Sequence, residues 1–299
     1  MTGLGATTGA TTLLIMRHGD RLDYEVGKNA WLARATTSSA LVASDPPLST
    51  LGHRQASEVA AFLGASEKVD AIVTSPYLRA LQTAQPLARA TGLPLLVDWA
   101  CAESHQKPSS LPPLDSRLPY FPEINEHYEP MMGTVITDGP DGREPGVEPR
   151  LEHMRRMLHL ARALPNHPLF AGKTVAVFTH AASVALVAAL TGTPSLDAAG
   201  KMAPCGVCKL VIAADGTSSL AASADETSGY LTAAAGAATG AWGFADSAEP
   251  LASAEAMWQE ARRLGPTDLT ALQVRLVDQP AAAAEDEAYE PESLVADRH

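Results

Sequence analysis

The chain has 299 residues, of which 46% are hydrophobic and only 5% are aromatic. This length and apolar content suffice for a sizeable core, in one large domain or two small ones. The formal net charge is −12, from 22 basic and 34 acidic residues. This balance argues against nucleic acid or an anionic membrane as the main partner, and an anionic substrate would need a local cluster of cations.

Neither a targeting signal nor a membrane span is evident in the sequence. Residues 1–12 are small and polar without a basic region, and no apolar run approaches the roughly 20 residues of a membrane helix. The three cysteines are too few for a disulfide framework, which favours a cytoplasmic location. Cys205 and Cys208 have the spacing of a redox or zinc pair, but no second ligand pair accompanies them. We therefore interpret them as buried structural thiols.

The apolar run at residues 13–16 is typical of a short strand that is buried on both faces. Arg17 and His18 follow where this strand must end, and ligands of open parallel sheets bind beyond the carboxyl ends of the strands. Gly19 allows a tight turn and a close approach of backbone N–H groups to an anion. A lone Arg-His-Gly is common by chance, so the rest of the chain must decide whether this is a phosphate site.

A long, irregular connection at residues 21–45 could form one wall of a pocket. A helix is predicted at residues 49–63, with Ser49 as its N-cap and an apolar stripe on one face. Gly52 is a poor helix former in the first turn. Its presence there predicts a close approach of another backbone segment or of the phosphate.

The next apolar run predicts a strand at residues 71–74. Ser75 and Pro76 then resemble an N-cap and a first helical residue, so we expect a helix over residues 76–91. Arg79 falls in the first turn of this helix, beside its free N–H groups and the positive end of its dipole. A second arginine thus follows the end of a second strand.

A third strand is predicted at residues 95–97, and Glu103 follows it in a loop from which it could reach over the pocket. Residues 104–149 are rich in proline and lack any repeating period. Connections of this length inside a domain are usually functional or disordered, so we expect a flap over the active site. Three aromatic side chains of this insertion could line the substrate cleft: Tyr120, Phe121 and Tyr128.

A helix at residues 148–164 and a strand at residues 174–179 follow, and His180 then stands at the start of another helix. The remaining predicted elements are a hairpin and a final helix, at residues 209–214 with 218–222 and at residues 251–264.

Alternation of strands and helices predicts a three-layer α/β/α fold with a mostly parallel sheet, helices on both faces and an inserted flap. We expect a flexible leader at residues 1–11, one catalytic domain at residues 12–275 with its insertion at 104–149, and an acidic disordered tail at residues 276–299.

Polar side chains thus follow four predicted strand ends: Arg17 and His18, Arg79, Glu103, and His180. Two arginines and a histidine can neutralise the oxygens of a phosphoryl group. A second imidazole can attack phosphorus, and a carboxyl group can protonate the leaving oxygen and then activate water. The arginines would supply the charge that a metal ion supplies elsewhere, so we expect no metal and no other cofactor.

The chain resembles the histidine phosphatase superfamily, in its phosphoglycerate mutase-like branch. The motifs that carry the resemblance occur in the family order, at residues 14–19 (LIMRHG), 47–56 (PLSTLGHRQA), 74–84 (TSPYLRALQTA) and 177–180 (VFTH). Within the branch, residues 17–23, 27–31 and 45–49 are most similar to the phosphatase domain of the suppressor-of-T-cell-receptor-signalling and ecdysteroid-phosphate phosphatase proteins.

The resemblance implies that His18 is the phosphorylated nucleophile and that Glu103 is the proton donor, with His180 beside them in catalysis. The phosphate pocket that it implies consists of Arg17, Arg21, Arg79 and His180. It also implies a metal-independent phosphomonoesterase that acts on phosphotyrosine or another bulky or aromatic phosphate. The expected partner is therefore a small-molecule or phosphoprotein phosphate monoester, and a homodimer is compatible with the sequence.

Two alternatives remain open from the sequence. A phosphoglycerate mutase-type phosphotransferase would need a second phosphate site, for which Arg117, Arg143 and Arg150 are available. The chain lacks the Ser and Asn that mutases carry just after their Arg-His-Gly, which argues against this activity. An inactive phosphate-binding module is the other alternative, although such proteins typically lose the nucleophile or an arginine, and this chain keeps them.

Overall fold

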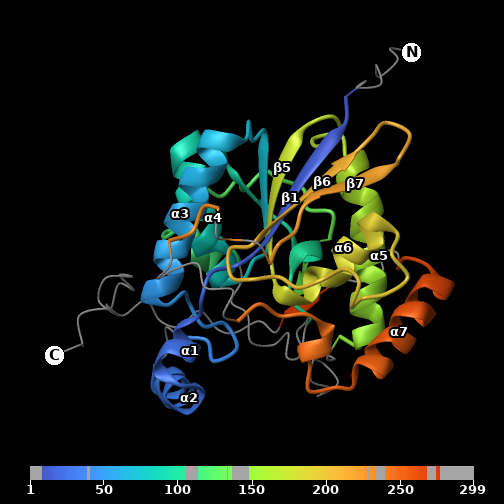
Figure 1. Ribbon diagram of the computed structural model, residues 1–299. Helices are drawn as coiled ribbons and strands as arrows, with labels where there is room; N and C mark the ends of the chain where they lie inside the picture. Colours follow the sequence, from blue (N-terminus) through green and yellow to red (C-terminus); the bar gives the residue numbers. More distant parts are fainter. Residues whose placement is uncertain are drawn as a thin grey trace.

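A computed structural model describes residues 9–38, 41–104, 114–132, 148–225, 227, 229–232 and 240–267, and the backbone of 134–136 and 274–276 (Figure 1). Its main sheet has six strands in the order β3-β2-β5-β1-β6-β7. The four strands from β3 to β1 are parallel, and β6 and β7 form the antiparallel end of the sheet. These strands are β1 (Thr11–Arg17), β2 (Ala71–Thr74), β3 (Leu95–Val97), β5 (Thr174–Thr179), β6 (Val207–Ile212) and β7 (Ser218–Ala222).

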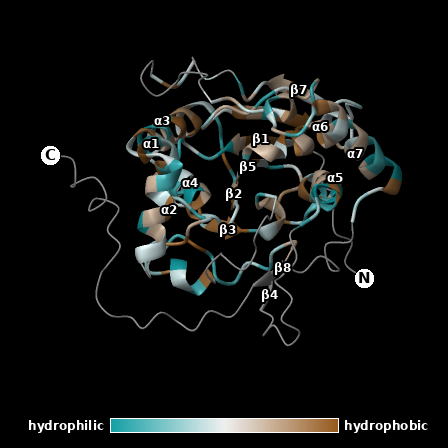
Figure 2. Ribbon diagram, turned by 90° about the horizontal axis from the view of Figure 1, so that it is seen from below, coloured by the Kyte–Doolittle hydropathy of each residue, from teal (hydrophilic) through white to brown (hydrophobic). Residues whose placement is uncertain are grey.

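Helices cover both faces of this sheet (Figure 2). On one face lie α3 (Thr50–Ser66) and α4 (Leu78–Thr91), and on the other lie α5 (Arg150–Asn166), α6 (Val184–Thr191) and α7 (Leu251–Leu264). The predicted three-layer α/β/α fold is therefore confirmed.

A second sheet pairs β4 (Thr134–Ile136) with β8 (Val274–Leu276) in parallel. None of the helices in the described ranges has both the length and the apolar character needed to cross a membrane.

Strand β1 shows why the apolar run at its centre forms the middle of the sheet. Leu13 and Ile15 belong to the core beneath α5 and α6, whereas Leu14 and Met16 belong to the core beneath α3 and α4. All four side chains are at most 1% exposed. Successive side chains of a strand point to opposite faces, so a run without polar residues suits a strand covered on both sides.

The start of α3 confirms two expectations from the sequence. The Ser49 hydroxyl accepts the N–H of Gly52 at 2.9 Å and caps the helix. A Cβ atom on Gly52 would lie only 2.1 Å from the carbonyl oxygen of Asp20. The glycine therefore allows the chain after β1 to pass directly against the first turn of α3, which fixes the position of the Arg17-His18-Gly19 segment.

The predicted start of the helix that carries Arg79 is wrong by two residues. Helix α4 begins at Leu78 instead of Pro76, and Ser75 does not cap it. The free N–H of Leu78 is bound by the distant carboxylate of Asp45, at 3.0 and 3.1 Å from its two oxygens. Arg79 nevertheless lies in the first turn, as predicted.

The irregular connection at residues 21–45 contains two helices that periodicity did not reveal, α1 (Leu22–Val26) and α2 (Lys28–Thr37). They lie beyond the carboxyl end of β1, at the lower left of Figure 1. Only a few of their side chains are buried, in a small separate cluster around Trp31. This cluster gives too little apolar signal for a helical pattern to be recognised.

The described part of the insertion, residues 114–132, packs beside β3 and α4. The Leu95 N–H donates to the carbonyl of Glu123 at 2.8 Å, and Arg89 pairs with the Glu123 carboxylate. The expectation that its aromatic residues line the substrate cleft is wrong: Phe121 is in the core, the Tyr128 hydroxyl donates to Asp98, and Tyr120 is exposed. Residues 105–113, 133 and 137–147 of the predicted flap, residues 1–8 of the leader and the tail beyond residue 276 lie outside the described residues.

Candidate active site

A cavity of about 680 Å³ opens beyond the carboxyl ends of the parallel strands. It brings together the residues that the sequence placed at separate strand ends. Its walls include Arg17, His18, Arg21, Arg79 and Glu103. His180 lies directly behind this wall and is fully buried. Parallel strands deliver their carboxyl ends to one edge, which is why residues up to 163 positions apart meet there.

His18 is held as a neutral imidazole with a defined tautomer. Its Nδ1 lies 2.7 Å from the carbonyl oxygen of Gly19, and because a carbonyl can only accept, Nδ1 carries the proton. The Nε2 lone pair is then free. Burial lowers the pKa of His18 well below its usual range, and the neighbouring Arg79 and Arg17 guanidinium groups lower it further.

His180 packs against His18, with the two ring centroids 5.3 Å apart in an edge-on arrangement. Its Nδ1 lies 3.2 Å from a terminal nitrogen of Arg79, which can only donate, so Nδ1 accepts. Its Nε2 then donates to the Ser75 hydroxyl at 2.8 Å. Burial and the charge of Arg79 lower the pKa of His180 well below its usual range. Ser75, expected as a helix cap, instead orients this imidazole.

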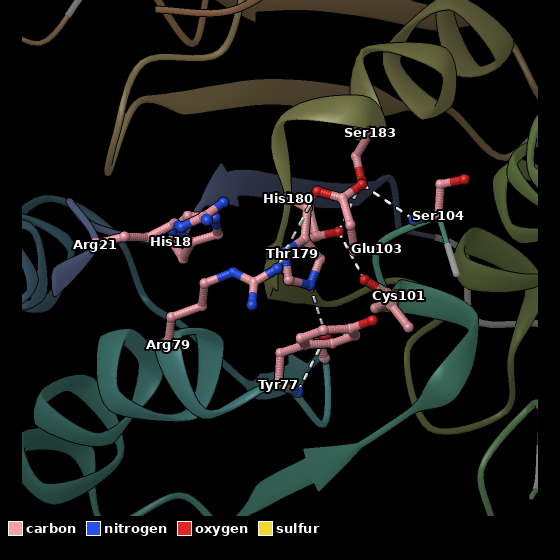
Figure 3. Close-up of polar contacts among 12 residues, drawn as sticks. His18, Arg21, Tyr77, Arg79, Cys101, Glu103, Ser104, Thr179, His180 and Ser183 are labelled. Carbon is pink, nitrogen blue, oxygen red and sulfur yellow. Dashed lines mark hydrogen bonds and ion pairs between the residues drawn. The ribbon is translucent and has the colours of Figure 1, made fainter. Parts of the chain in front are cut away.

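Two buried guanidinium groups flank the imidazoles. Arg17 is 6% exposed and donates from Nη1 to the carbonyl oxygens of Met202 and Gly240, at 3.1 and 2.5 Å. Arg79 is 3% exposed and extends toward His180 from the first turn of α4 (Figure 3). The Nε donors of both arginines are buried without a partner within the described structure. Unpaired buried donors are costly, so these groups favour an anion that accepts from them.

Asp45 is the residue of this site that sequence reasoning missed. It is fully buried and accepts from the Leu78 N–H, from Arg79 at 3.4 Å, and from Arg117. The carboxylate therefore orients Arg79 and also accepts an N–H group in the first turn of α4 that has no partner within the helix. Arg117 binds this carboxylate and does not line the cavity, so it is not available for the second phosphate site that a mutase would need.

Arg21 enters the cavity from the start of α1. Its Nε donates to Asp23 at 2.9 Å, and its guanidinium lies over the Tyr24 ring, 4.5 Å from the centroid. Arg150 also lines the cavity, where it pairs with Glu249 at 2.5 Å. The predicted pocket wall at residues 21–45 is confirmed, since Tyr24 and Trp31 belong to it. Arg143 lies outside the described residues.

Glu103 reaches the cavity from the loop after β3. Its side chain is 28% exposed, and Oε2 lies 3.8 Å from Nδ1 of His180 (Figure 3). Oε1 accepts the N–H of Ser104 at 3.0 Å. The preceding turn is joined to β5, because the Thr179 hydroxyl donates to the Cys101 carbonyl at 2.8 Å. A carboxyl group thus lies beside the imidazole pair with one side open to the cavity.

The chain matches the protein-family model of the histidine phosphatase superfamily (branch 1) over residues 13–224. The chain belongs to this superfamily. It is a histidine phosphatase, and membership supports phosphomonoester hydrolysis as its general activity. None of the curated proteins matches the chain significantly.

Several solved structures are similar to this histidine phosphatase. A mycobacterial glucosyl-3-phosphoglycerate phosphatase is 24% identical, with 72% of this chain and 99% of that chain covered and a TM-score of 0.47. The ecdysone phosphate phosphatase of Bombix mori, in complex with tungstate, is 20% identical over 61% of this chain and 78% of its own, with a TM-score of 0.47. A putative alpha-ribazole-5'-P phosphatase of Escherichia coli is 17% identical over 75% and 100%, with a TM-score of 0.49.

The three cysteines of this histidine phosphatase, Cys101, Cys205 and Cys208, are free and buried. Burial raises the pKa of the Cys208 thiol to about 12, which keeps it protonated. The interpretation of Cys205 and Cys208 as structural thiols is confirmed. Within the described ranges, no group of three His, Cys, Asp or Glu side chains has the arrangement of a metal site.

Proposed function

We propose that this histidine phosphatase hydrolyses phosphate monoesters through a phosphohistidine at His18. The observation that carries the proposal is the geometry of His18, whose Nδ1 is held by the Gly19 carbonyl and whose imidazole has the buried guanidinium groups of Arg17 and Arg79 as neighbours. A lone pair on Nε2 is the electron pair that nucleophilic attack on phosphorus requires. Arg17 and Arg79 supply the positive charge that stabilises the equatorial phosphoryl oxygens, a role that a metal ion has in other phosphoryl-transfer enzymes.

In the first step, Nε2 of His18 forms a bond to phosphorus while the bond from phosphorus to the ester oxygen breaks. Glu103, in its acid form, gives its proton to that oxygen, so the alcohol or phenol leaves neutral. In the second step, Glu103 takes a proton from water as the water oxygen attacks phosphorus. The bond from phosphorus to nitrogen breaks, and inorganic phosphate leaves with His18 and Glu103 in their starting states.

We further propose an aromatic or otherwise bulky leaving group, such as that of phosphotyrosine. The cavity volume of about 680 Å³ exceeds what a phosphate alone needs. Several aromatic side chains from distant segments form its walls, where they can pack on an apolar leaving group: Tyr24, Trp31, Tyr77, Trp242 and Phe244.

The test is phosphate release from para-nitrophenyl phosphate in the presence of EDTA, with wild type and His18→Ala compared. We expect turnover by the wild type and a loss on the order of 10⁴-fold or more in the variant, because the nucleophile is removed. His18 follows the strand end and does not fill the core, so the variant should keep its thermal transition. An active His18→Ala protein, or an inert wild type, would overturn the proposal.

A further inference from the structure

Arg156, in the middle of α5, is a fully buried guanidinium that does not line the cavity. Its Nη1 donates to the carbonyl oxygens of Ala100 and Ala102, at 2.8 and 2.9 Å. Its Nη2 lies 3.3 Å from the carbonyl oxygen of Glu103, a shared and weaker hydrogen bond, because the two N–H groups of Nη2 also serve Glu148 and His153. One rigid group therefore binds three backbone carbonyls of the turn that carries the proposed acid.

The same guanidinium also binds two side chains, those of Glu148 and His153. Its Nε and Nη2 donate to the two oxygens of Glu148, at 2.8 and 2.7 Å. Nδ1 of His153 accepts from Nη2 at 2.8 Å. Although burial alone would raise it, the charge of Arg156 holds the pKa of Glu148 well below its usual range. The cluster is thus a buried ion pair in the two-pronged geometry that only arginine provides.

The turn that Arg156 binds is also packed in the core, where Ala100, Cys101 and Ala102 are fully buried. The Thr179 hydroxyl holds the Cys101 carbonyl, and the Asp98 carboxylate accepts the N–H of Ala100. The Glu103 side chain itself is partly exposed, and its hydrogen bond to the N–H of Ser104 does not tie it to the sheet or a helix. The position of its carboxyl group, 3.8 Å from His180, therefore depends on where its backbone is held.

We propose that Arg156 is a positioning residue for proton transfer, and that it acts through the backbone of residues 100–103 to hold Glu103 within reach of the leaving oxygen. The inference rests on the proposed role of Glu103 as general acid. Proton transfer needs heavy atoms within hydrogen-bond distance, and a displacement of about 1 Å can cost on the order of 10²-fold in rate.

A misplaced Glu103 should slow the hydrolysis of esters with poor leaving groups more than that of esters with good ones. A nitrophenolate departs readily without a proton, whereas a phenolate of higher pKa depends on the acid. Arg156→Lys keeps the charge opposite Glu148 but loses the planar fork that spans three carbonyls. We expect it to lower kcat/KM for phenyl phosphate on the order of 10-fold more than for para-nitrophenyl phosphate.

Glu103→Gln serves as the reference, and it should show the same dependence on the leaving group with a larger amplitude. In the Glu103→Gln background, Arg156→Lys should change kcat/KM for phenyl phosphate by less than about 3-fold, because there is no acid left to position. The neighbouring Arg155→Lys is the matched control, since Arg155 is on the same helix but pairs with Glu152 at 2.9 Å outside the cavity. It should behave as the wild type with both substrates.

Equal losses on both substrates in Arg156→Lys, or losses that multiply in the double variant, would show that Arg156 supports the fold alone and would overturn the inference. A Glu103→Gln variant with equal losses on both substrates would instead overturn the proposed acid, so the two failures are distinguishable. If Arg156→Lys does not fold, Glu148→Gln replaces it, because this variant loosens the guanidinium while it keeps the shape of the side chain. The same pattern across the two substrates is then expected, and its absence overturns the inference.

Discussion

Two cavities lie at opposite ends of β1, and they differ in chemistry far more than in size. The cavity at the carboxyl end is about 680 Å³ and contains His18, Arg17 and Arg79 in its walls. The cavity at the amino end is about 520 Å³ and is lined by residues such as Thr11 and Gly172. Among the described residues that line this second cavity, Arg162 is the one ionisable side chain, and it is exposed.

The difference shows that the direction of the strands, and not cavity volume, determines where this molecule can do chemistry. At the carboxyl ends, the turns that leave β1, β2 and β5 converge and their polar residues meet. At the amino ends, the cavity is lined largely by small residues such as Gly9, Gly172 and Ala213. The cations at the carboxyl end are buried and oriented by fixed partners, whereas Arg162 is in water, where a charge interacts weakly with an anion.

Among the arginine substitutions in the two cavities, that of Arg79 should lower activity the most. Arg79→Gln removes a buried positive charge next to both imidazoles, and we expect kcat/KM for para-nitrophenyl phosphate to fall about 10²- to 10³-fold. Steady-state kinetics measure this loss. A variant that retains more than about half of the wild-type value would show that Arg79 does not stabilise the phosphoryl group.

Asp45→Asn is expected to lower the stability of the protein. The change leaves Arg79 and Arg117 without their buried carboxylate and weakens the bond to the first turn of α4. Breaking a buried ion pair typically costs about 3–5 kcal/mol, so the free energy of unfolding should fall by an amount in this range. Urea unfolding followed by circular dichroism measures it, and an unchanged midpoint would contradict the assigned contacts.

The pH dependence follows from the lowered pKa values of His18 and His180. In the unfolded chain both imidazoles take up protons below about pH 6.5, whereas in the folded protein they stay neutral until the pH is well below this value. Stability is therefore complete above about pH 6.5 and falls as the pH decreases below it. Activity depends on the folded pKa of His18, so the acid limb of kcat/KM should lie below about pH 6.5. An acid limb centred above this pH would contradict a neutral, buried nucleophile.

The smallest effect is expected at the opposite cavity. Arg162→Gln is the same substitution as Arg79→Gln, made in a cavity of comparable size. Because Arg162 is exposed, we expect a change within about 0.5 kcal/mol in stability and less than about 2-fold in kcat/KM. A loss of activity that approached that of Arg79→Gln would remove the contrast between the two cavities.

Local patterns in the sequence predicted the sheet and the residues at its carboxyl end, because apolar runs mark buried strands and polar residues mark where they stop. The same patterns could not predict Asp45 as the partner of Arg117, from which it is separated by 72 residues. They also misassigned Ser75, since a local capping rule cannot anticipate that His180, 105 residues away, binds its hydroxyl. Pairings that depend on long-range packing become visible only in the folded chain.

The most direct measurement is to trap the covalent intermediate and locate the phosphoryl group. Wild-type protein is mixed with para-nitrophenyl phosphate, quenched in alkali within a single turnover and digested for mass spectrometry, with His18→Ala treated in parallel. Phosphohistidine survives alkali, and we expect it on the peptide that contains His18 in the wild type and nowhere in the variant. Phosphate attached to another residue, or turnover without any phosphopeptide in the single-turnover quench, would contradict His18 as the nucleophile.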